Sequence, residues 1–298
     1  MTDIPLFYAY TVIEASAADA LPDLPAPLGG GLRLVGDGRH AAVVEPVDPR
    51  HFDEEPLRAG LEDLDWLSAV ARAHHGVVAA VGDVTTTVPL RLATVCRGED
   101  GVRRMLSEAG ERLAAAIDRL TGAQEWGVKL YARPDAPGPD AGGTAGGPEG
   151  TAPPDGPRGP DGTPRPEGTP RPDGADGTSG RGYLRRRLDD RRAREASRTL
   201  LARTAQDLHR ELSRHAAAAV LHPPQDGRLS GADGGQDGRH GGRQILNAAY
   251  LVPVGGRQEF LDAVPAPGAL GAGLHVEVTG PWVPYSFAAA HDDAGPAR

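Results

Sequence analysis

Residues 6–14 read LFYAYTVIE, a run of aromatic and β-branched residues that ends on an acid. This composition predicts a β-strand. Two further β-like runs, 32–35 and 41–47, flank the short sequence Gly36-Asp37-Gly38. A turn-forming connection of this kind between two strands predicts a hairpin. The chain therefore opens with strands.

Helical spacing follows these strands. Between residues 55 and 75 apolar side chains recur every three or four positions, which puts them on one face of a helix, and the glycine that follows is expected to end it. Residues 77–81 and 88–95 are short β-like runs, and residues 99–120 return to helical spacing. We expect residues 1–122 to form an N-terminal α+β domain.

The second half of the chain reads as strand, helix, strand, helix, strand. The predicted strands are 126–132, 245–253 and 274–279, and the predicted helices are 183–222 and 257–264. Three strands with two helices across one face indicate a ferredoxin-like or related open sheet, which we assign to residues 123–298. The long helix begins with RRRLDDRRARE, residues 185–195, and this charged half is expected to project into solvent or to meet a partner.

Two stretches rich in glycine interrupt the C-terminal half. Residues 134–181 contain 13 Gly and 12 Pro in 48 positions and no large apolar side chain. A segment with nothing to bury cannot offset the entropy of ordering, so we predict a disordered insert. Residues 223–242 are dominated by Gly, Asp, Gln and Arg and predict a flexible loop. The fold class is thus α+β, with two domains, a long helix and two inserts.

Charge and cysteine content narrow the possible partners and compartment. The 298 residues carry a formal net charge of −9, which argues against nonspecific nucleic-acid binding. Cys96 is the single cysteine, so no intramolecular disulfide forms and a reducing compartment fits. Asp3 lies where a signal peptide would be basic, and no apolar run approaches the roughly 20 residues of a membrane span. We expect a soluble cytoplasmic protein that does not enter a membrane.

The common catalytic and ligand-binding motifs are missing from the sequence. The single lysine, Lys129, lies between valine and leucine, which excludes a phosphate-binding P-loop. No G-x-G-x-x-G opens a helix, and no serine lies in G-x-S-x-G. His209, His215 and His222 are six and seven residues apart, whereas a metal-binding pair on a helix needs a spacing of four. We therefore expect no catalytic residue, no cofactor and no metal.

Three polar features each allow a functional and a structural interpretation. The acids between Asp53 and Asp65 could form a general-acid pair or a cation site. We favour the structural interpretation, in which they place negative charge at a helix N-terminus. Cys96 is interpreted as a small buried hydrophobe, because nothing in the spacing indicates a base that would make it a nucleophile. The arginines of residues 185–194 could contact phosphates, but ion pairs with neighbouring acids on the same helix are favoured.

Aromatic residues gather at both ends of the chain. Three of the 13 lie in residues 7–10 and three in residues 282–287. Pro281 and Pro284 lack the amide hydrogen that a central strand requires, so the second group is expected either to anchor its own domain or to offer a stiff apolar surface to another protein. The candidate partner-binding residues are this group with the apolar stripe of the long helix, namely Trp282, Tyr285, Phe287, Leu201, Leu208 and Leu212.

Several motifs, taken in order, resemble the gas vesicle protein F/L family, GvpF/GvpL. In the first half these are LFYAY, Trp66-Leu67 followed by His74, and the stretch Val88-Pro89-Leu90-Arg91 to Thr94-Val95. In the second half they are Gly127-Val128-Lys129, Tyr183-Leu184 with Arg186-Arg187, Asn247 to Val252, and Thr279-Gly280-Pro281-Trp282-Val283-Pro284-Tyr285-Ser286-Phe287. Cys96 and Val283 depart from the family pattern, and the pattern leaves F-like or L-like identity open.

The resemblance implies a non-enzymatic accessory or minor structural protein of gas vesicles, in the cytoplasm and at the vesicle. It also implies two α+β domains, the second a modified ferredoxin-like fold, and binding to the hydrophobic shell protein GvpA and to other accessory proteins during assembly. Two alternatives remain open from the residues alone. One is a nucleic-acid-binding module built on the arginine-rich half-helix, and the other is a small-molecule enzyme on a ferredoxin-like sheet.

Overall fold

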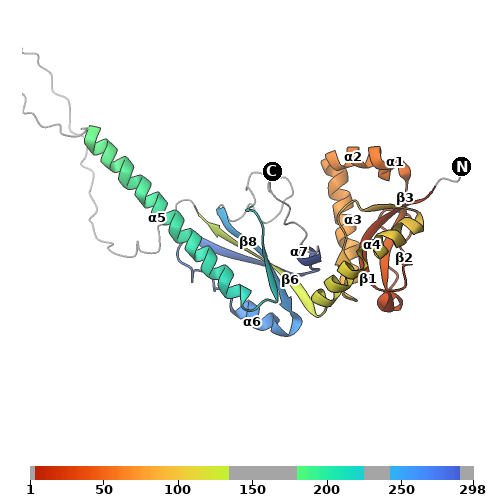
Figure 1. Ribbon diagram of the computed structural model, residues 1–298. Helices are drawn as coiled ribbons and strands as arrows, with labels where there is room; N and C mark the ends of the chain where they lie inside the picture. Colours follow the sequence, from red (N-terminus) through yellow and green to blue (C-terminus); the bar gives the residue numbers. More distant parts are fainter. Residues whose placement is uncertain (1–3, 134–179, 225–241, 289–298) are drawn as a thin grey trace, which may run out of the picture.

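A computed structural model describes residues 4–133, 180–224 and 242–288, and the described residues form a mixed α and β fold with two sheets. We call residues 4–122 the N-terminal unit and the remaining described residues the C-terminal unit. Figure 1 shows the two units side by side, with one long helix extending away from them. The predicted inserts lie outside the described residues, except for their outermost positions, 180–181, 223–224 and 242.

The sheet of the N-terminal unit is antiparallel and is built around its first strand. Its strands are β1 (Leu6–Glu14), β2 (Arg33–Gly36), β3 (His40–Val47), β4 (Val88–Pro89) and β5 (Val95–Arg97). The order is β2-β3-β1-β4, and β5 also pairs with β1. Along β1, Tyr8 and Tyr10 face one hydrophobic cluster while Phe7 and Ala9 face the other, so the predicted strand is a central strand buried on both sides. The predicted hairpin is confirmed as β2 and β3.

Helices cover both faces of this sheet. They are α1 (Pro49–Phe52), α2 (Glu54–Glu62), α3 (Leu64–Gly82) and α4 (Gly98–Leu120), and a short 3-10 turn, η1 (Ala15–Ala20), follows β1. Valines of α3 pack on the tyrosine side of β1, whereas leucines of α4 pack on the other side. The result is three layers, with the sheet between α3 and α4.

The predicted helix over 55–75 and strand over 77–81 were wrong in two ways. The chain breaks at Asp63, whose carboxylate accepts hydrogen bonds from the N–H groups of Asp65 and Trp66 and so caps α3. The helix then continues through Gly76 to Gly82. Val77, Val78 and Val81 recur at helical spacing and are buried against β1, so tertiary packing outweighs both the glycine and the β-branched composition.

The C-terminal unit has a four-stranded antiparallel sheet in the order β7-β8-β6-β9. Its strands are β6 (Ala123–Ala132), β7 (Ala218–Leu221), β8 (Arg243–Pro253) and β9 (Leu274–Trp282). Its helices are α5 (Gly180–Ser213), α6 (Arg257–Asp262) and α7 (Tyr285–Ala288), with a 3-10 turn η3 (Val254–Gly256).

The long helix was predicted to reach residue 222, but it ends at Ser213. Residues 218–221 instead pair with β8 as the edge strand β7, so their backbone groups are hydrogen-bonded within the sheet.

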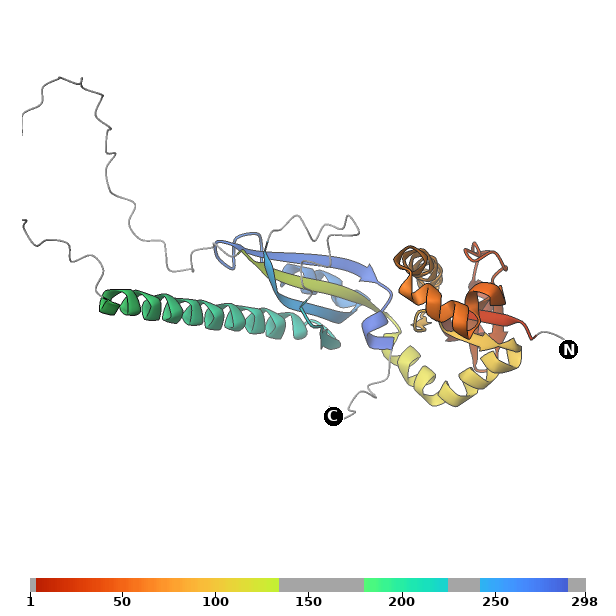
Figure 2. The same ribbon diagram turned by 90° about the horizontal axis from the view of Figure 1, so that it is seen from above.

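Only the second half of α5 is packed. Ala205, Leu208 and Leu212 are buried on the face of the sheet formed by β6 and β8, together with Phe260 of α6. The first half is exposed, including Leu184 and Leu188. Figure 2 shows this half running past the edge of the sheet into open space, in agreement with the expected charged projection.

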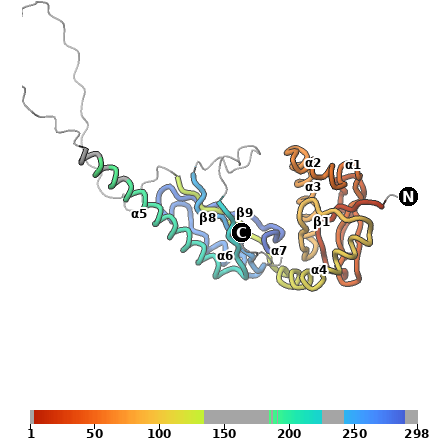
Figure 3. Tube along the Cα trace, turned by 45° about the horizontal axis from the view of Figure 1, so that its top comes forward, coloured from red at the N-terminus to blue at the C-terminus, as the bar shows by residue number. Residues whose placement is uncertain are grey.

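The two units share a hydrophobic cluster. Only two residues separate α4 from β6, so the chain passes directly from one unit to the other, as Figure 3 shows. Leu113 and Leu120 of α4 belong to the same cluster of buried side chains as Leu251 of β8 and Phe287 of α7. The opposite face of the C-terminal sheet from α5 therefore borders the core of the N-terminal unit.

Candidate functional site

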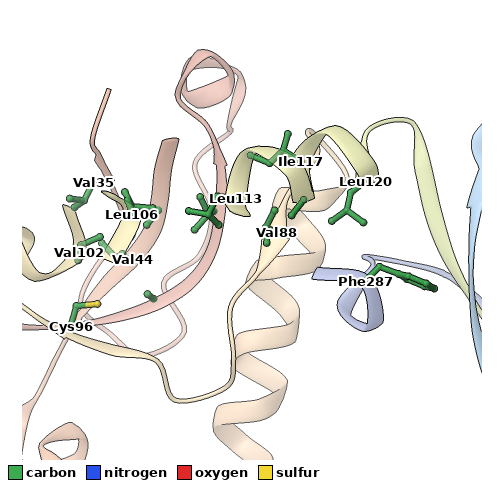
Figure 4. Close-up of a cluster of buried hydrophobic side chains, with 14 of the residues drawn as sticks. Val35, Val44, Val88, Cys96, Val102, Leu106, Leu113, Ile117, Leu120 and Phe287 are labelled. Atoms are coloured by element: carbon green, nitrogen blue, oxygen red, sulfur yellow. The ribbon is translucent and has the colours of Figure 1, made fainter. Parts of the chain in front are cut away.

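The aromatic C-terminal segment lies where the two units meet. β9 is an edge strand, which accommodates Pro281 because no further strand needs its amide hydrogen. The chain then turns into α7, and Phe287 is 4% exposed within a cluster to which α4 contributes more side chains than any other element. Figure 4 shows its ring directed away from β1 on the side of Leu120. The segment thus acts as an anchor between units, whereas the sequence had indicated contact with its own domain or with another protein.

Hydrogen bonds hold α7 in this position. The Arg119 guanidinium donates to the carbonyl oxygen of Phe287 at 2.6 Å. Both the backbone N–H and the hydroxyl of Ser286 donate to the Glu125 carboxylate at 2.8 Å, and His222 Nε2 lies 3.1 Å from Ser286 Oγ. Burial raises the pKa of Glu125, while the two bonds from Ser286 oppose the rise. Ser286 is engaged by an acid and a histidine, but its hydroxyl proton goes to the acid, which is not the arrangement of an activated nucleophile.

Two aromatic side chains of the segment remain accessible. Trp282 is 48% exposed and Tyr285 is 37% exposed. Both rings lie beside His75 of α3, with centroid distances of 6.1 Å and 6.0 Å respectively. His75 was expected at a helix terminus, but it lies in the middle of α3 because that helix continues to Gly82. Trp282, Tyr285 and His75 form a partly exposed patch, which we call the aromatic patch.

His74, the next residue, is buried beneath this patch. Its Nδ1 lies 3.0 Å from the hydroxyl oxygen of Tyr8, and the same oxygen accepts a hydrogen bond from the backbone N–H of Ala93 at 3.2 Å. Burial lowers the pKa of His74 to about 4 and raises that of Tyr8 to about 12, so both side chains are neutral at physiological pH. Burial also raises the pKa of Tyr285.

A groove of about 650 Å³ opens next to the aromatic patch. It lies between α3, the connection from β4 to β5, α4 and α7. Its lining is Ala71, His74, His75, Val88, Pro89, Leu90, Arg91, Leu92, Ala109, Arg112, Leu113, Ala116, Tyr285 and Ala288. We call it the α3–α4 groove. An apolar recess of this size can receive several side chains of a partner.

The leucines proposed as partner-binding residues lie elsewhere. Leu208 and Leu212 are 4% and 0% exposed in the core beneath α5, and Leu201 is only partly buried. Their cluster is separate from the one that holds Phe287. The structure therefore brings Trp282 and Tyr285 together at an accessible site, and it uses Phe287, Leu208 and Leu212 for packing.

The acids between Asp53 and Asp65, Cys96 and the arginines of α5 take up structural roles. Asp53 and Asp63 cap α2 and α3, and Glu54, Glu55 and Asp65 lie in the first turns. Burial raises the pKa of the Cys96 thiol, which disfavours the reactive thiolate. Arg191 pairs with Glu195 at 3.0 Å and Arg192 with Asp189 at 3.9 Å, which are the expected ion pairs between residues three or four apart on one helix.

The described residues contain neither a metal-binding cluster nor a membrane-spanning helix. Within residues 4–133, 180–224 and 242–288, His, Cys, Asp and Glu side chains form no group of three that could hold a metal ion. In the same part of the chain, every helix is too short or too polar to span a bilayer.

Sequence reasoning did not bring the groove residues together, although His74, Arg91 and Tyr285 lie in the quoted family motifs. Arg91, Arg112 and His75 line the α3–α4 groove, but each comes from a different element, and no local pattern marks them as neighbours. The place of His75 depended on how far α3 extends beyond Gly76, which the sequence did not indicate.

Comparison with known proteins gives a consistent result. Residues 6–289 match the family described as gas vesicle synthesis protein GvpL/GvpF. The chain is 42% identical over 284 residues to Gas vesicle protein L from Streptomyces sp. (strain CB03234), covering 95% of this chain and 92% of that protein.

Two solved structures have a similar fold. One is gas vesicle protein GvpF from Microcystis aeruginosa, with a TM-score of 0.54 and 16% identity over 96% of this chain and 100% of that one. The other is GvpF from Anabaena sp. PCC7120, with a TM-score of 0.53 and 13% identity over 96% and 97%. At these identities the structures support the fold alone. The sequence matches carry the assignment, and the chain belongs to the GvpL/GvpF family of gas vesicle proteins.

Proposed function

We propose that this protein is an accessory or minor structural component of gas vesicles that binds the shell protein GvpA and other accessory proteins during assembly. Membership of the family supports the gas vesicle role. The aromatic patch and the adjoining groove are the observation that supports the binding role, because they form a continuous accessible apolar surface.

The chemistry of the proposed client explains why such a surface is useful. A small shell subunit with an apolar face would aggregate in water before it joined the lattice. A second protein that covers this face reversibly keeps the subunit available for assembly. Trp282 and Tyr285 suit this role because aromatic side chains bury a large area with few rotatable bonds.

We further propose two domains, residues 1–122 and 123–298, the second a modified ferredoxin-like fold. Its support is the order β6, α5, β7, β8, α6, β9 combined with the strand order β7-β8-β6-β9. The shared cluster implies that these domains move little relative to one another. We propose that the protein acts without catalysis, in the cytoplasm and at the vesicle.

The test is capture of GvpA by the purified full-length protein. The variant Trp282→Ala/Tyr285→Ala removes the exposed rings and leaves the buried Phe287 in place. We expect capture to fall by about tenfold, corresponding to about 1.4 kcal/mol for loss of two partly buried aromatic contacts. Unchanged capture by a folded variant would contradict the proposed contact surface.

A matched control removes two other exposed apolar side chains. Leu61 and Leu64 are 42% and 75% exposed on α2 and α3, and neither lines the groove. Leu61→Ala/Leu64→Ala should capture GvpA as the unaltered protein does. A similar loss in both variants would indicate nonspecific adhesion.

A further inference from the structure

The face of α5 that packs on the C-terminal sheet continues beyond the sheet as a row of arginines. Going back along the helix from Leu201, steps of three or four residues lead to Arg198, Arg194 and Arg191. These arginines therefore lie on the face that the sheet buries further along the helix, and all three are exposed. Arg191 pairs with Glu195, whereas Arg194 and Arg198 form no ion pair with another described residue.

Two exposed leucines extend this row toward the start of α5. Leu184 and Leu188 are 59% and 55% exposed, and Leu188 is a surface neighbour of Arg191 because the two are three residues apart. Residues 184–198 carry seven arginines and three acids, a formal charge of +4. A partner with exposed acids and apolar side chains would complement this surface. We call it the basic face, and its members are Leu184, Leu188, Arg191, Arg194 and Arg198.

A complementary surface lies elsewhere on the same chain. Residues 53–65, which run from the cap of α2 to the first turn of α3, carry six acids and one arginine, a formal charge of −5. Their last five residues, LEDLD, are all exposed, and Leu61 and Leu64 are 42% and 75% exposed. Glu62 and Asp65 form no ion pair with another described residue. We call residues 61–65 the acidic corner.

These two surfaces are too far apart to meet within one molecule. Figures 1 and 3 show α2 and the first half of α5 at opposite ends of the molecule. Residues 180–200 span about 30 Å of helix, and they extend away from the N-terminal unit. A contact between them therefore joins two copies, and because each copy keeps one free surface of either kind, the same contact can repeat.

A second copy fits the basic face better than a nucleic acid does. Asp189, Asp190 and Glu195 interrupt the arginines, and the whole chain carries a formal net charge of −9, so a strand of phosphates would meet like charge. The acidic corner instead offers a few carboxylates, and its two exposed leucines match the two leucines of the basic face.

We propose that the basic face of α5 binds the acidic corner of a second copy of this chain, so that copies associate head to tail. The arginines of one copy meet the carboxylates of the next, and the leucines of the two surfaces pack together. Exposed ion pairs contribute little each, so the association is weak and depends on protein and salt concentration. This inference does not depend on the proposed function, because the aromatic patch takes no part in the contact.

Sedimentation velocity of the purified full-length protein measures the association. The mean sedimentation coefficient should rise with protein concentration at about 0.05 M salt and stay at the monomer value at about 0.5 M salt, since salt screens exposed charges. A monomer under both conditions would overturn the proposal. A monomer that instead binds an oligonucleotide through Arg194 and Arg198 would also overturn it, by making the basic face a polyanion site.

Charge reversal at each surface tests the pairing. Arg194→Glu/Arg198→Glu and Glu62→Arg/Asp65→Arg should each weaken self-association by at least about tenfold, because attractive contacts become repulsive. An equimolar mixture of the two variants should associate again, since the reversed basic face complements the reversed acidic corner. Folded variants that stay monomeric when mixed would contradict the pairing.

Matched controls make the same changes in net charge at other exposed positions. Arg104→Glu/Arg203→Glu reverses one arginine of α4 and one of the packed half of α5, and Glu108→Arg/Asp118→Arg reverses two acids of α4. Both controls should associate as the unaltered protein does. An equal loss in the controls would mean that net charge alone governs association, and the proposal would fail. Circular dichroism and thermal melting confirm that each variant is folded.

Cysteine crosslinking tests the direction of the contact. Leu64→Cys and Leu188→Cys are prepared as separate proteins and mixed under mild oxidation, while the native Cys96 is buried. We expect a disulfide-linked dimer from the mixture and monomer from either protein alone. Crosslinking of one variant with itself as fast as in the mixture would indicate a symmetric contact and overturn the head-to-tail arrangement.

Discussion

Several buried polar side chains of the N-terminal unit are hydrogen-bonded to one another. Tyr10 donates to the Glu45 carboxylate at 2.6 Å, and the hydroxyls of Thr11 and Thr87 are hydrogen-bonded to each other. Glu45 also accepts from the N–H of Gly30, which lies where a Cβ atom would approach the Pro46 carbonyl oxygen to 1.9 Å. Glycine is therefore required at this position, and the loop before β2 is fastened to β3.

His74 should make stability depend on pH. Its pKa is about 4 in the folded protein and 6.5 in the unfolded chain, so between these values the unfolded chain binds a proton that the folded protein does not. The free energy of unfolding should fall as pH falls from about 6.5 to about 4, by up to about 1.4 kcal/mol per pH unit. Denaturant unfolding at several pH values, compared with His74→Phe, measures this; equal pH slopes in the two proteins would refute it.

Ser286 should contribute to stability through Glu125. Ser286→Ala removes the hydroxyl that donates to the carboxylate at 2.8 Å but keeps the backbone donor. We expect a loss of about 1–2 kcal/mol in unfolding free energy at pH 7, and a further rise in the Glu125 pKa measured by carbon NMR. Ser107→Ala on the exposed face of α4 is the control and should change neither quantity. A Glu125 pKa that does not move would contradict the assigned bond.

At the scale of elements, α5 is one helix with two environments. Its second half is buried on the C-terminal sheet, whereas its first half relies on intrahelical ion pairs such as Arg191 with Glu195. Exposed pairs of this kind contribute only about 0.3–0.5 kcal/mol each. The first half therefore has little to hold it helical apart from its continuity with the packed half.

Hydrogen exchange should divide α5 at this boundary. Amides of residues 185–197 should exchange at least about tenfold faster than those of residues 205–213, because the first half can unwind without opening the core. Mass spectrometry of the isolated full-length protein measures this. Equal protection along the helix would mean that another molecule, such as a second copy, covers the first half.

At the scale of the whole molecule, one hydrophobic cluster joins both units. Leu120, Leu251 and Phe287 come from α4, β8 and α7 and are all nearly inaccessible to solvent. Since these side chains belong to one cluster shared by the two units, unfolding of one unit exposes apolar surface of the other. We expect the described part of the chain to unfold as one cooperative body.

Phe287→Ala should weaken this coupling. A buried phenylalanine replaced by alanine typically costs about 3–5 kcal/mol, so the melting temperature should fall by about 6–20 °C and the single transition should broaden or split. Differential scanning calorimetry measures both effects. Tyr285→Ala, which removes a neighbouring exposed ring, should leave one transition. A single sharp transition in Phe287→Ala would show that the units remain coupled without this side chain.

Elements whose signals are local were predictable from the amino-acid sequence. The strand at residues 6–14, the hairpin that follows, and the helix later found at Gly98–Leu120 were predicted because composition and periodicity lie within a few turns of chain. The amino-acid sequence also showed that the common catalytic motifs are absent from it. Family motifs supplied the gas vesicle assignment, which the sequence matches then established.

The remaining features depend on packing, because the interactions that create them join residues far apart in the chain. Gly76 remains helical since the valines after it are buried against β1, and residues 218–221 become a strand since β8 offers them hydrogen bonds. The same is true of the candidate site. Tyr8 meets His74 and Arg119 meets Phe287 across 66 and 168 residues, and such pairings depend on how the sheets and helices pack, which no local pattern encodes.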